Sequence, residues 1–500
     1  MTEIELKFQV PPARREAVAA AVAGRAAPVV QRLQAAYFDT AARELAGAGI
    51  ALRLRREGSR WVQTLKSGSG DTLLRLEHNV LRPGRGATPP ALEPQLHDGT
   101  PPGERLHALL AGRAGDALRC QYRTDVRRGL RVLRSRGALL ELAFDQGVIV
   151  AGERSLPLCE LEIELKRGAP AALLATARAW VQRHGLWLDT RSKAERGTLL
   201  AAGQARAPAR KARPVALAQH MGLADARRAV LAECLQQVAV NASQVASGDF
   251  GDEHVHQLRV GLRRLRSALR LFEGGGDTAT QALAEPAAAL FRALGAARDA
   301  AAVAAPLQAQ LAQALASTGL ALQPPALPLG EVVDPAALVR APGVQAWLLD
   351  LMAQTLPAAD GPDAPEAVDE SPAGEHLSAR LNRWHRSVIA AADRFATLDD
   401  EARHRLRKQV KRLRYGVEFA QALWGAKKTA RYLRALAAVQ ERLGALNDVG
   451  VALAALRTAA PRDAATLFAL GWLAARRAAL IADCAPALQA FAGVQRPWKA

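Results

Sequence analysis

Apolar and charged side chains alternate with a period of two in several short segments of the first 200 residues. The segment that opens the chain, TEIELKF, places Glu3, Glu5 and Lys7 on one face of a strand and apolar side chains on the other. The same alternation recurs in ALRLRRE, WVQTLK, LLRLEHNV, YRTDVRRGLRV, ALLELAFDQG and CELEIELK, with turn signals between them. Helical segments follow Pro11-Pro12 and Pro170. We therefore predict an α+β domain over residues 1–200, built on an antiparallel sheet.

The remainder of the chain has the periodicity of helices. A basic, Ala/Pro-rich segment at 201–216 reads as a linker, and residues 217–500 follow it as a second domain. Within that domain HQLRVGLRRLRSALRLF, from His256, resembles HRLRKQVKRLRYGVEF, from His404. A second pair of similar segments begins at Leu294 and Leu443, with nearly the same separation. This pattern predicts a duplicated helical unit, with repeats at about 217–320 and 375–500 joined by a Pro/Gly-rich connection that lacks a clear helical period.

The charged faces of the predicted strands are best explained if all of them line one shared interior. One strand with a charged face is usually a solvated edge, and that interpretation suits each segment taken alone. All of them together leave more apolar surface than the few predicted helices can cover. A closed barrel resolves this, because it presents the apolar faces to the helices and keeps the charged faces inside. The interior would then hold Glu3, Glu5, Lys7, Arg53, Arg55, Lys66, Arg75, Glu77, Arg123, Asp125, Arg127, Glu141, Asp145, Glu160, Glu162, Glu164 and Lys166.

Such an interior suits a phosphorylated ligand. Arginine and lysine bind phosphate oxygens, whereas clustered carboxylates repel phosphates unless a divalent cation such as Mg²⁺ lies between them. The net charge of +19 also indicates an anionic partner. The sequence has no P-loop, so an NTPase mechanism of that type is not supported.

Other features narrow the class of protein. The four cysteines are far apart in the sequence, which favours neither a zinc site nor a disulfide framework. The first residues have the pattern of an acidic strand and not the basic-then-apolar pattern of a secretion signal, so we expect none. The most apolar segment, 465–482, is interrupted by Arg476 and Arg477. We expect a cytoplasmic protein that has no membrane partner.

The first 200 residues resemble the CYTH family of triphosphate tunnel metalloenzymes. EIELK matches the family's ExExK signature, and YFDT, ALRLRRE, WVQTLK, YRTDVRR, FDQG, CELEIELK and SKAERG follow in order. The resemblance implies an eight-stranded antiparallel barrel whose tunnel binds triphosphates with Mg²⁺ or Mn²⁺. The metal ligands it implies are Glu3, Glu5, Asp145 and carboxylates among Glu160, Glu162 and Glu164, with the choice among these three left open. The phosphate contacts it implies are Lys7, Arg53, Arg55, Lys66, Arg75, Arg123, Arg127, Lys193 and Arg196. A second metal ion, or a carboxylate such as Glu5 or Glu77, would orient the attacking water.

The two similar helices carry stripes of basic side chains. His256, Arg259, Arg263, Arg266 and Arg270 share one face of the first helix. His404, Arg407, Lys411 and Arg414 fill the same positions in the second, where Glu418 replaces Arg270. These faces could simply be solvated. However, neither basic stretch contains an acidic residue that could pair along the helix, so a bound anion would relieve the repulsion between like charges.

These segments resemble the CHAD domain, a duplicated α-helical bundle. The resemblance implies a basic surface that binds inorganic polyphosphate. The residues it implies are His256, Arg259, Arg263, Arg264, Arg266, His404, Arg407, Lys408, Lys411, Arg412 and Arg414. Arg298-Asp299 and Asn447-Asp448 match a second motif, in which the aspartates either orient basic side chains or stabilise helix ends.

The leading hypothesis is a CYTH–CHAD enzyme that hydrolyses inorganic triphosphate, with its helical domain bound to polyphosphate and the protein associated with polyphosphate granules. One alternative is a catalytically idle scaffold that binds polyphosphate. A second is an adenylate cyclase, an activity found among relatives of the CYTH family. A nucleic-acid partner is disfavoured, because few aromatic side chains for base stacking accompany the basic stripes.

Overall fold

The computed structural model of the protein describes residues 2–25, 29–68, 74–83, 86, 88–111, 118–273, 282–319, 322–326, 333–356, 372–459 and 463–498. The side chains of residues 2, 3, 74, 75, 296–304 and 459 also lie outside this description. The chain forms two compact units, each assembled from three segments. The first comprises Met1–Lys211, Leu235–Leu258 and Pro335–Ala359, and the second comprises Ala212–Cys234, Arg259–Asp334 and Asp360–Ala500.

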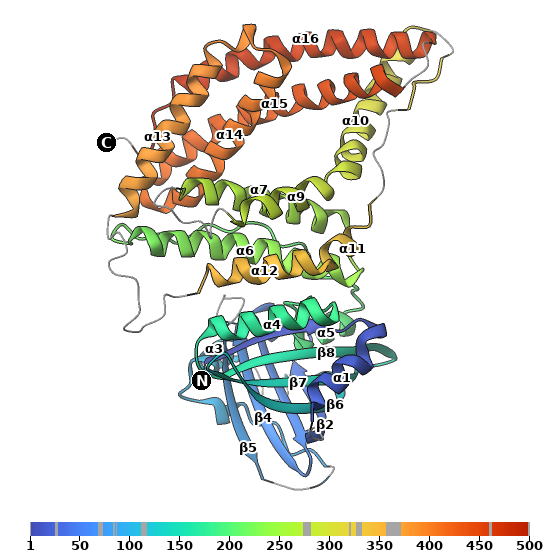
Figure 1. Ribbon diagram of the computed structural model, residues 1–500, viewed down its shortest axis with the longest axis vertical. Helices are drawn as coiled ribbons and strands as arrows, with labels where there is room; N and C mark the ends of the chain where they lie inside the picture. Colours follow the sequence, from blue (N-terminus) through green and yellow to red (C-terminus); the bar gives the residue numbers. More distant parts are fainter. Residues whose placement is uncertain are drawn as a thin grey trace. The chain divides into compact units, whose positions relative to one another are not determined.

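The first unit is built on a closed antiparallel barrel (Figure 1). Its strands are β1 (Thr2–Gln9), β2 (Val29–Asp39), β3 (Ile50–Glu57), β4 (Arg60–Gly68), β5 (Leu74–Arg82), β6 (Arg119–Ser135), β7 (Ala138–Ala151) and β8 (Arg154–Arg167). Their order is β5-β4-β3-β2-β6-β7-β8-β1, and pairing between β1 and β5 closes the ring. This confirms the predicted eight-stranded barrel. A two-residue strand that the sequence did not predict, β9 (Trp187–Leu188), pairs with the end of β1 beyond β5.

Most of the apolar core of the barrel lies on its outer face, beneath short helices. The helices of this region are α1 (Arg15–Ala23), α2 (Glu44–Gly47), α3 (Pro101–Leu110), α4 (Pro170–His184) and α5 (Lys193–Ala201). Leu52 and Leu65, on the outer face, are fully buried against Leu45 of α2 and Leu106 of α3. Helix α1 packs on β6 and β7, and α4 packs on β7 and β8. This arrangement turns the opposite face of each strand inward, as the alternation predicts.

Helix α5 packs on the inner face instead. Its Ala194 accepts a hydrogen bond from the hydroxyl of Tyr122 (2.9 Å), and its Gly197 lies directly against the ring of that tyrosine. A Cβ atom at Gly197 would come within 2.2 Å of the ring, so this close approach requires glycine. A capping box formed by Ser192 and Glu195 fixes the start of the helix.

The first unit also contains parts of the helical half of the chain. They come from α6 (Leu223–Ser247), α7 (Asp252–Leu271), α11 (Pro335–Arg340) and α12 (Pro342–Ala353). Helix α12 packs against α4 of the barrel region. Helices α11 and α12 lie within the stretch 320–375, which the sequence indicated to be a connection without helical period. Between Gln345 and Met352 of helix α12, every side chain except Asp350 is buried, and a helix with apolar side chains on most sides shows little amphipathic period.

The second unit is helical. It contains α9 (Ala284–Ala293), α10 (Ala296–Ala316), α13 (Ala373–Ala392), α14 (Asp400–Ala420), α15 (Ala426–Ala459) and α16 (Ala464–Ala492), with parts of α6 and α7. The predicted apolar stripe of the second repeat, which includes Leu406, Val410 and Leu413 of α14, is fully buried. Three of the four leucines of the corresponding stripe in α7 are equally inaccessible to solvent, and the last, Leu269, is 4% exposed. The helical part of the fold prediction is thereby confirmed.

Helix α16 is long and apolar enough to cross a membrane by length and composition alone. It is the one helix of this kind in the part of the chain that the structure describes, and it packs along α15. The sequence-based exclusion of any such segment was therefore too strict. Core helices of globular domains share these properties, so this feature assigns no membrane location.

Candidate active site

The register of the strands identifies which side chains share the interior of the barrel. Directly paired residues of antiparallel strands lie on the same face. Starting from Arg53, such pairs lead through Tyr37 to Tyr122, and along the same face of β6 to Arg128. From Arg128 they continue around the ring to Asp145, Glu160, Glu162, Lys7, Glu77, Lys66 and Thr64, and return to Arg53. Basic and acidic side chains therefore line one common surface.

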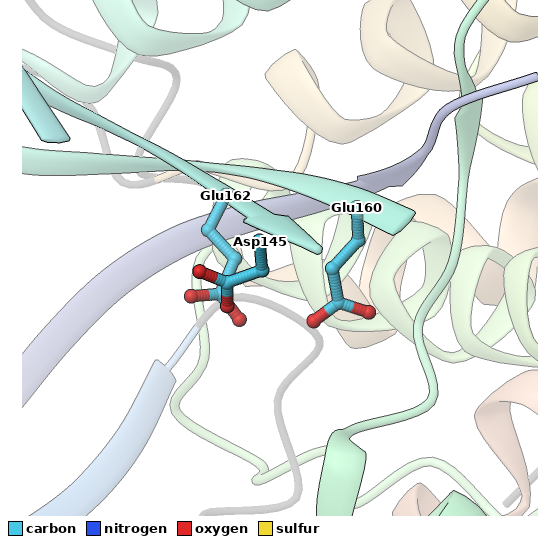
Figure 2. Close-up of side chains that lie close together, drawn as sticks. All are labelled: Asp145, Glu160 and Glu162. Atoms are coloured by element: carbon cyan, nitrogen blue, oxygen red, sulfur yellow. The ribbon is translucent and has the colours of Figure 1, made fainter. Parts of the chain in front are cut away.

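Three carboxylates meet at one place on this surface. Asp145 of β7 and Glu160 and Glu162 of β8 each offer an oxygen atom within 4.8 Å of the others. Figure 2 shows the three side chains extending from the same side of the two strands. Asp145 and Glu160 are inaccessible to solvent, and Glu162 is nearly so. Buried carboxylates at this density require compensating cations.

Protein cations supply that compensation. The Lys193 ammonium lies 2.7 Å from Asp145 Oδ2 and 2.8 Å from Glu162 Oε1, and it also contacts Glu160. Arg128 donates to both oxygens of Asp145 (2.6 Å each) and to Glu162 Oε2 (2.5 Å). Arg196 pairs with Glu160. Burial favours a raised pKa for Glu162, but Lys193, Arg128 and Lys7 more than offset this and hold its pKa well below the ordinary value.

A second group of carboxylates lies farther along the same strands. Glu164 pairs in register with Glu5 on one side and with Glu141 on the other. The Lys166 ammonium bridges this group, at 2.7 Å from Glu164 and 3.5 Å from Glu141. Burial, together with Glu141 and Glu5, raises the pKa of Glu164 despite the contact with Lys166. Of the three glutamates that the sequence could not separate, Glu160 and Glu162 thus lie with Asp145, whereas Glu164 lies with Glu5.

The predicted phosphate-binding cations of β3 and β4 also face inward. Arg53 donates to the hydroxyl of Tyr37 (3.2 Å). Burial and the nearby Arg53 lower the pKa of Arg55, which pairs with Glu57. Lys66 lies 2.5 Å from Glu77, and Asn79 donates to Glu77 Oε1 (2.8 Å). The side chains of Glu3 and Arg75 lie outside the described residues.

Strand β6 corrects the sequence-based prediction. Arg123 and Arg127 are exposed on the outer face, where Asp125 pairs with Arg32. Arg128, which was not among the predicted residues, faces inward. Because both faces of β6 carry arginine, charge alone does not identify the inner face, which runs from the largely buried Tyr122 to Arg128. The aromatic inner face at this end packs against α5, and charge count alone could not reveal that.

The basic helices of the second unit also differ in part from the prediction. Arg264 is buried, donates to Glu418 Oε2 (2.9 Å) and lies over the ring of Phe419, so its contacts are structural. Arg259 is buried over Phe291, at 4.9 Å from the ring centre. Of the remaining predicted residues, Arg263, Arg266, Arg407, Lys411, Arg412 and Arg414 are half-buried, and His256, His404 and Lys408 are exposed.

The motif Asn447-Asp448 contacts two of the predicted polyphosphate-binding residues of α14. His404 contacts Asn447 Oδ1 through Nδ1 (2.8 Å), and Arg407 lies 3.9 Å from Asp448. This agrees with a positioning role for Asp448. The side chains of Arg298 and Asp299 lie outside the described residues.

A group of like charges lies on α7, α13 and α14. Burial and the neighbouring Arg270 and Arg380 lower the pKa of Arg412. Burial and Arg383 lower the pKa of Arg380 in turn. Neither Arg270 nor Arg380 was among the predicted binding residues. Arg380 lies on α13, outside both repeated segments, so no sequence motif marked it.

Comparison with known proteins agrees with this architecture. Residues 1–198 match the CYTH domain family and residues 229–457 match the CHAD domain family. The chain is a CYTH–CHAD protein. It is 28% identical over 170 residues to an inorganic triphosphatase of Haemophilus influenzae. That match covers 34% of this chain and 46% of the relative, so the chain spans about half the length of the curated relative it matches.

Two solved structures are also similar to the CYTH–CHAD chain. The CHAD domain of Ricinus communis is 30% identical, with 58% of this chain and 98% of that chain covered and a TM-score of 0.42. An adenylyl-cyclase-like protein of Hippeastrum, described as having a dominant triphosphatase activity, is 18% identical. That match covers 41% of this chain and 98% of the other, with a TM-score of 0.29.

Tunnel enzymes of the CYTH family depend on a metal ion, and the carboxylates of the CYTH–CHAD chain suit one. Asp145, Glu160 and Glu162 provide the oxygen ligands that Mg²⁺ and Mn²⁺ prefer. Their negative charges are already met by Lys193, Arg128 and Arg196. The donor set therefore fits a divalent cation in kind, and such a cation would compete with the Lys193 ammonium for the same oxygens.

Proposed function

We propose that the CYTH–CHAD chain hydrolyses inorganic triphosphate to diphosphate and phosphate inside its barrel, in a metal-dependent reaction. The observation that supports this most directly is the common inner surface traced by the strand register. It brings buried carboxylates and several basic side chains together in one interior. A chain of phosphates needs both kinds of group, the cations for its oxygens and the carboxylates for a bridging metal ion.

The basic residues would bind and align the substrate. Arg53, Arg55 and Lys66 face the interior from two neighbouring strands. The lowered pKa of Arg55 reflects repulsion from Arg53 as well as burial, and a polyanion between the two would relieve it. Arg128 and Lys193 pair with the carboxylates of Asp145 and Glu162 in the absence of substrate. Phosphate oxygens would compete with these carboxylates for the hydrogen bonds of the two cations.

The carboxylates would hold the metal ion and orient water. Oxygens of Asp145, Glu160 and Glu162 would hold Mg²⁺, which would supply charge neutralisation on the phosphates and polarisation of the phosphorus–oxygen bond. Glu77 is fixed between Lys66 and Asn79, in a position to accept a hydrogen bond from an attacking water. Glu5, in register with Glu164, is the second candidate for this role.

One assay tests the proposal and its alternatives. The full chain is incubated with Mg²⁺ and tripolyphosphate, ATP or long-chain polyphosphate, while phosphate release and cyclic AMP are followed. We expect phosphate release from tripolyphosphate and its loss in Glu162→Gln. Arg123→Ala, an exposed change on the outer face, is the matched control and should keep the activity. Hydrolysis that survives Glu162→Gln would contradict the site, whereas hydrolysis that survives Glu5→Ala would leave Glu77 as the residue that orients water. Cyclic AMP formation would favour the cyclase, and no turnover of any substrate would favour the scaffold.

We also propose that the helical domain binds inorganic polyphosphate. The group formed by Arg270, Arg380 and Arg412 supports this. Burial and the neighbouring arginines lower the pKa of Arg412 despite the opposing charge of Glu273, and a bound anion would relieve the repulsion between the arginines. A filter-binding or calorimetric titration with long-chain polyphosphate should show binding that weakens in Arg270→Ala/Arg412→Ala. Unchanged affinity in that double variant would contradict the proposed binding site.

A further inference from the structure

A short segment before α5 makes hydrogen bonds to β1, the strand that carries the ExExK signature. Helix α5 supplies Lys193 and Arg196 to the interior of the barrel. The segment runs from Leu188 of β9 to Arg191, just before α5. Asp189 N–H donates to the Lys7 carbonyl (2.9 Å), and the Lys7 ammonium donates to the Arg191 carbonyl (3.3 Å). The segment thus holds both the backbone and the side chain of Lys7.

The side chain of Asp189 ties the same segment to the carboxylate group. Asp189 is buried and accepts two hydrogen bonds from the guanidinium of Arg191 (2.9 Å each). Gln9 Nε2 donates to Asp189 Oδ2 (3.1 Å) and to Glu160 Oε2 (3.3 Å). Burial favours a raised pKa for Asp189, but Arg191 and Arg196 hold it below the ordinary value. Displacement of this segment would therefore reach Lys7 and Glu160 together.

One edge of the segment is paired with β1, and its other edge is covered by two polar side chains from the helical half of the chain. Gln345 of α12 accepts a hydrogen bond from Leu188 N–H (2.7 Å). Ser243 of α6 accepts from Thr190 N–H (3.0 Å) and lies 3.3 Å from the Leu188 carbonyl. Backbone groups at such an edge require partners when they are buried.

These two side chains are themselves fixed. Gln345 donates through Nε2 to the Val339 carbonyl (2.7 Å), which sets the orientation of its amide group. The Ser243 hydroxyl lies 2.8 Å from the Ala239 carbonyl, within its own helix. Each of the two side chains is 1% exposed. Water has no access to replace either one, so removing it leaves buried backbone groups without a partner.

We propose that Ser243 and Gln345 are positioning residues for the tunnel, acting on Lys7, Lys193 and Arg196 through the segment 188–191. This proposal rests on the proposed triphosphatase function, because its kinetic test measures the hydrolysis of tripolyphosphate. It gives the helical half of the chain a role in the barrel that is separate from polyphosphate binding.

The test uses the full chain with Ser243→Ala, Gln345→Leu and the double variant. Ser243→Thr, which keeps the hydroxyl, is the conservative rescue. Arg178→Gln is the matched control, because it removes the Arg178–Asp350 ion pair between α4 and α12 without touching the segment. The readouts are kcat and KM for tripolyphosphate, hydrogen exchange of residues 186–193, and the melting temperature.

We expect the double variant to raise KM about tenfold, with kcat within about twofold and faster exchange over 186–193. The control and Ser243→Thr should retain the wild-type KM and exchange. A purely structural role would lower the melting temperature and the active fraction without moving KM. If wild-type protein shows no hydrolysis, the proposed function fails, and the dissociation constant for tripolyphosphate replaces KM. Unchanged exchange and affinity in the double variant, or an equal effect in Arg178→Gln, would overturn the inference.

Discussion

Arg128 offers the sharpest test of the charge arrangement in the barrel. Its side chain is 18% exposed and makes three hydrogen bonds of 2.5–2.6 Å to Asp145 and Glu162. Arg128→Leu removes the cation and leaves two carboxylates under-compensated in a buried site. Removing one partner of a buried ion pair costs about 3–5 kcal/mol, because the remaining charge is uncompensated. We expect a loss of unfolding free energy of this order at neutral pH.

The adjacent residue supplies the control. Arg127 is exposed on the outer face of the same strand, so Arg127→Leu should change the unfolding free energy by no more than about 0.5 kcal/mol. Urea unfolding of both variants and of wild type, followed by circular dichroism at pH 7, measures the difference. Equal losses in the two variants would refute the assignment of Arg128 to the interior.

The difference in unfolding free energy between wild type and Arg128→Leu should also depend on pH. The depressed pKa of Glu162 stabilises wild type above the pKa of an unfolded glutamate, about 4.3. Without Arg128 the carboxyl pKa values should rise, and the variant should regain stability as its carboxylates protonate. The gap between wild type and Arg128→Leu should therefore narrow as the pH falls from 7 towards 4. A gap that stays constant over this range would contradict the electrostatic explanation.

Three further predictions concern the helical unit. Arg270→Glu would place a carboxylate beside Arg412 and should raise the melting temperature while weakening polyphosphate binding; unchanged affinity in a titration would count against that site. Glu418→Arg removes the partner of buried Arg264 and should lower the unfolding free energy by roughly 3 kcal/mol, whereas Glu401→Gln at an exposed pair should have little effect. Burial, with Arg496 nearby, lowers the pKa of His385 to about 4. As the pH falls, the imidazole is therefore protonated in the unfolded state before it is protonated in the folded state. The unfolding free energy should fall by up to roughly 3 kcal/mol between pH 6.5 and 4. His385→Phe should flatten that slope in urea unfolding, and an unaltered slope would assign it to other groups.

The sequence revealed the inner surface wherever one face of a strand was clearly charged. In β8, Glu160, Glu162 and Glu164 alternate with apolar side chains, and the register confirms that they share the inner face. In β6 arginines occupy both faces, so the same rule selected Arg123 and Arg127 instead of Arg128. The choice depends on which face α5 covers, and that contact joins residues more than 60 positions apart.

Contacts that depend on tertiary packing had no counterpart in the sequence pattern. Helix α12 is apolar on nearly all sides, so its burial concealed its period. Gln345 stands alone between Val344 and Ala346, Ser243 is one of several polar residues beside Gln244, and nothing local links either one to the segment after β9. Such residues become visible only when every buried backbone group is traced to its partner.

The two repeats of the helical domain differ at one position of the basic stripe, and this difference accounts for the distinct contacts of Arg264 and Arg412. Arg264 of the first repeat corresponds to Arg412 of the second, and Arg270 corresponds to Glu418. Across α7 and α14, Arg264 meets Glu418 in a buried ion pair. At the equivalent place, Arg412 meets Arg270, and the pKa of Arg412 falls through burial and this proximity. One substitution between the copies thus pairs arginine with a carboxylate in one of two related sites and places two arginines together, near Glu273, in the other. The first arrangement stabilises the fold without a ligand, and a bound anion would stabilise the second. We therefore predict that the exchange of Arg270 for Glu418 separates a structural site from the proposed polyphosphate site.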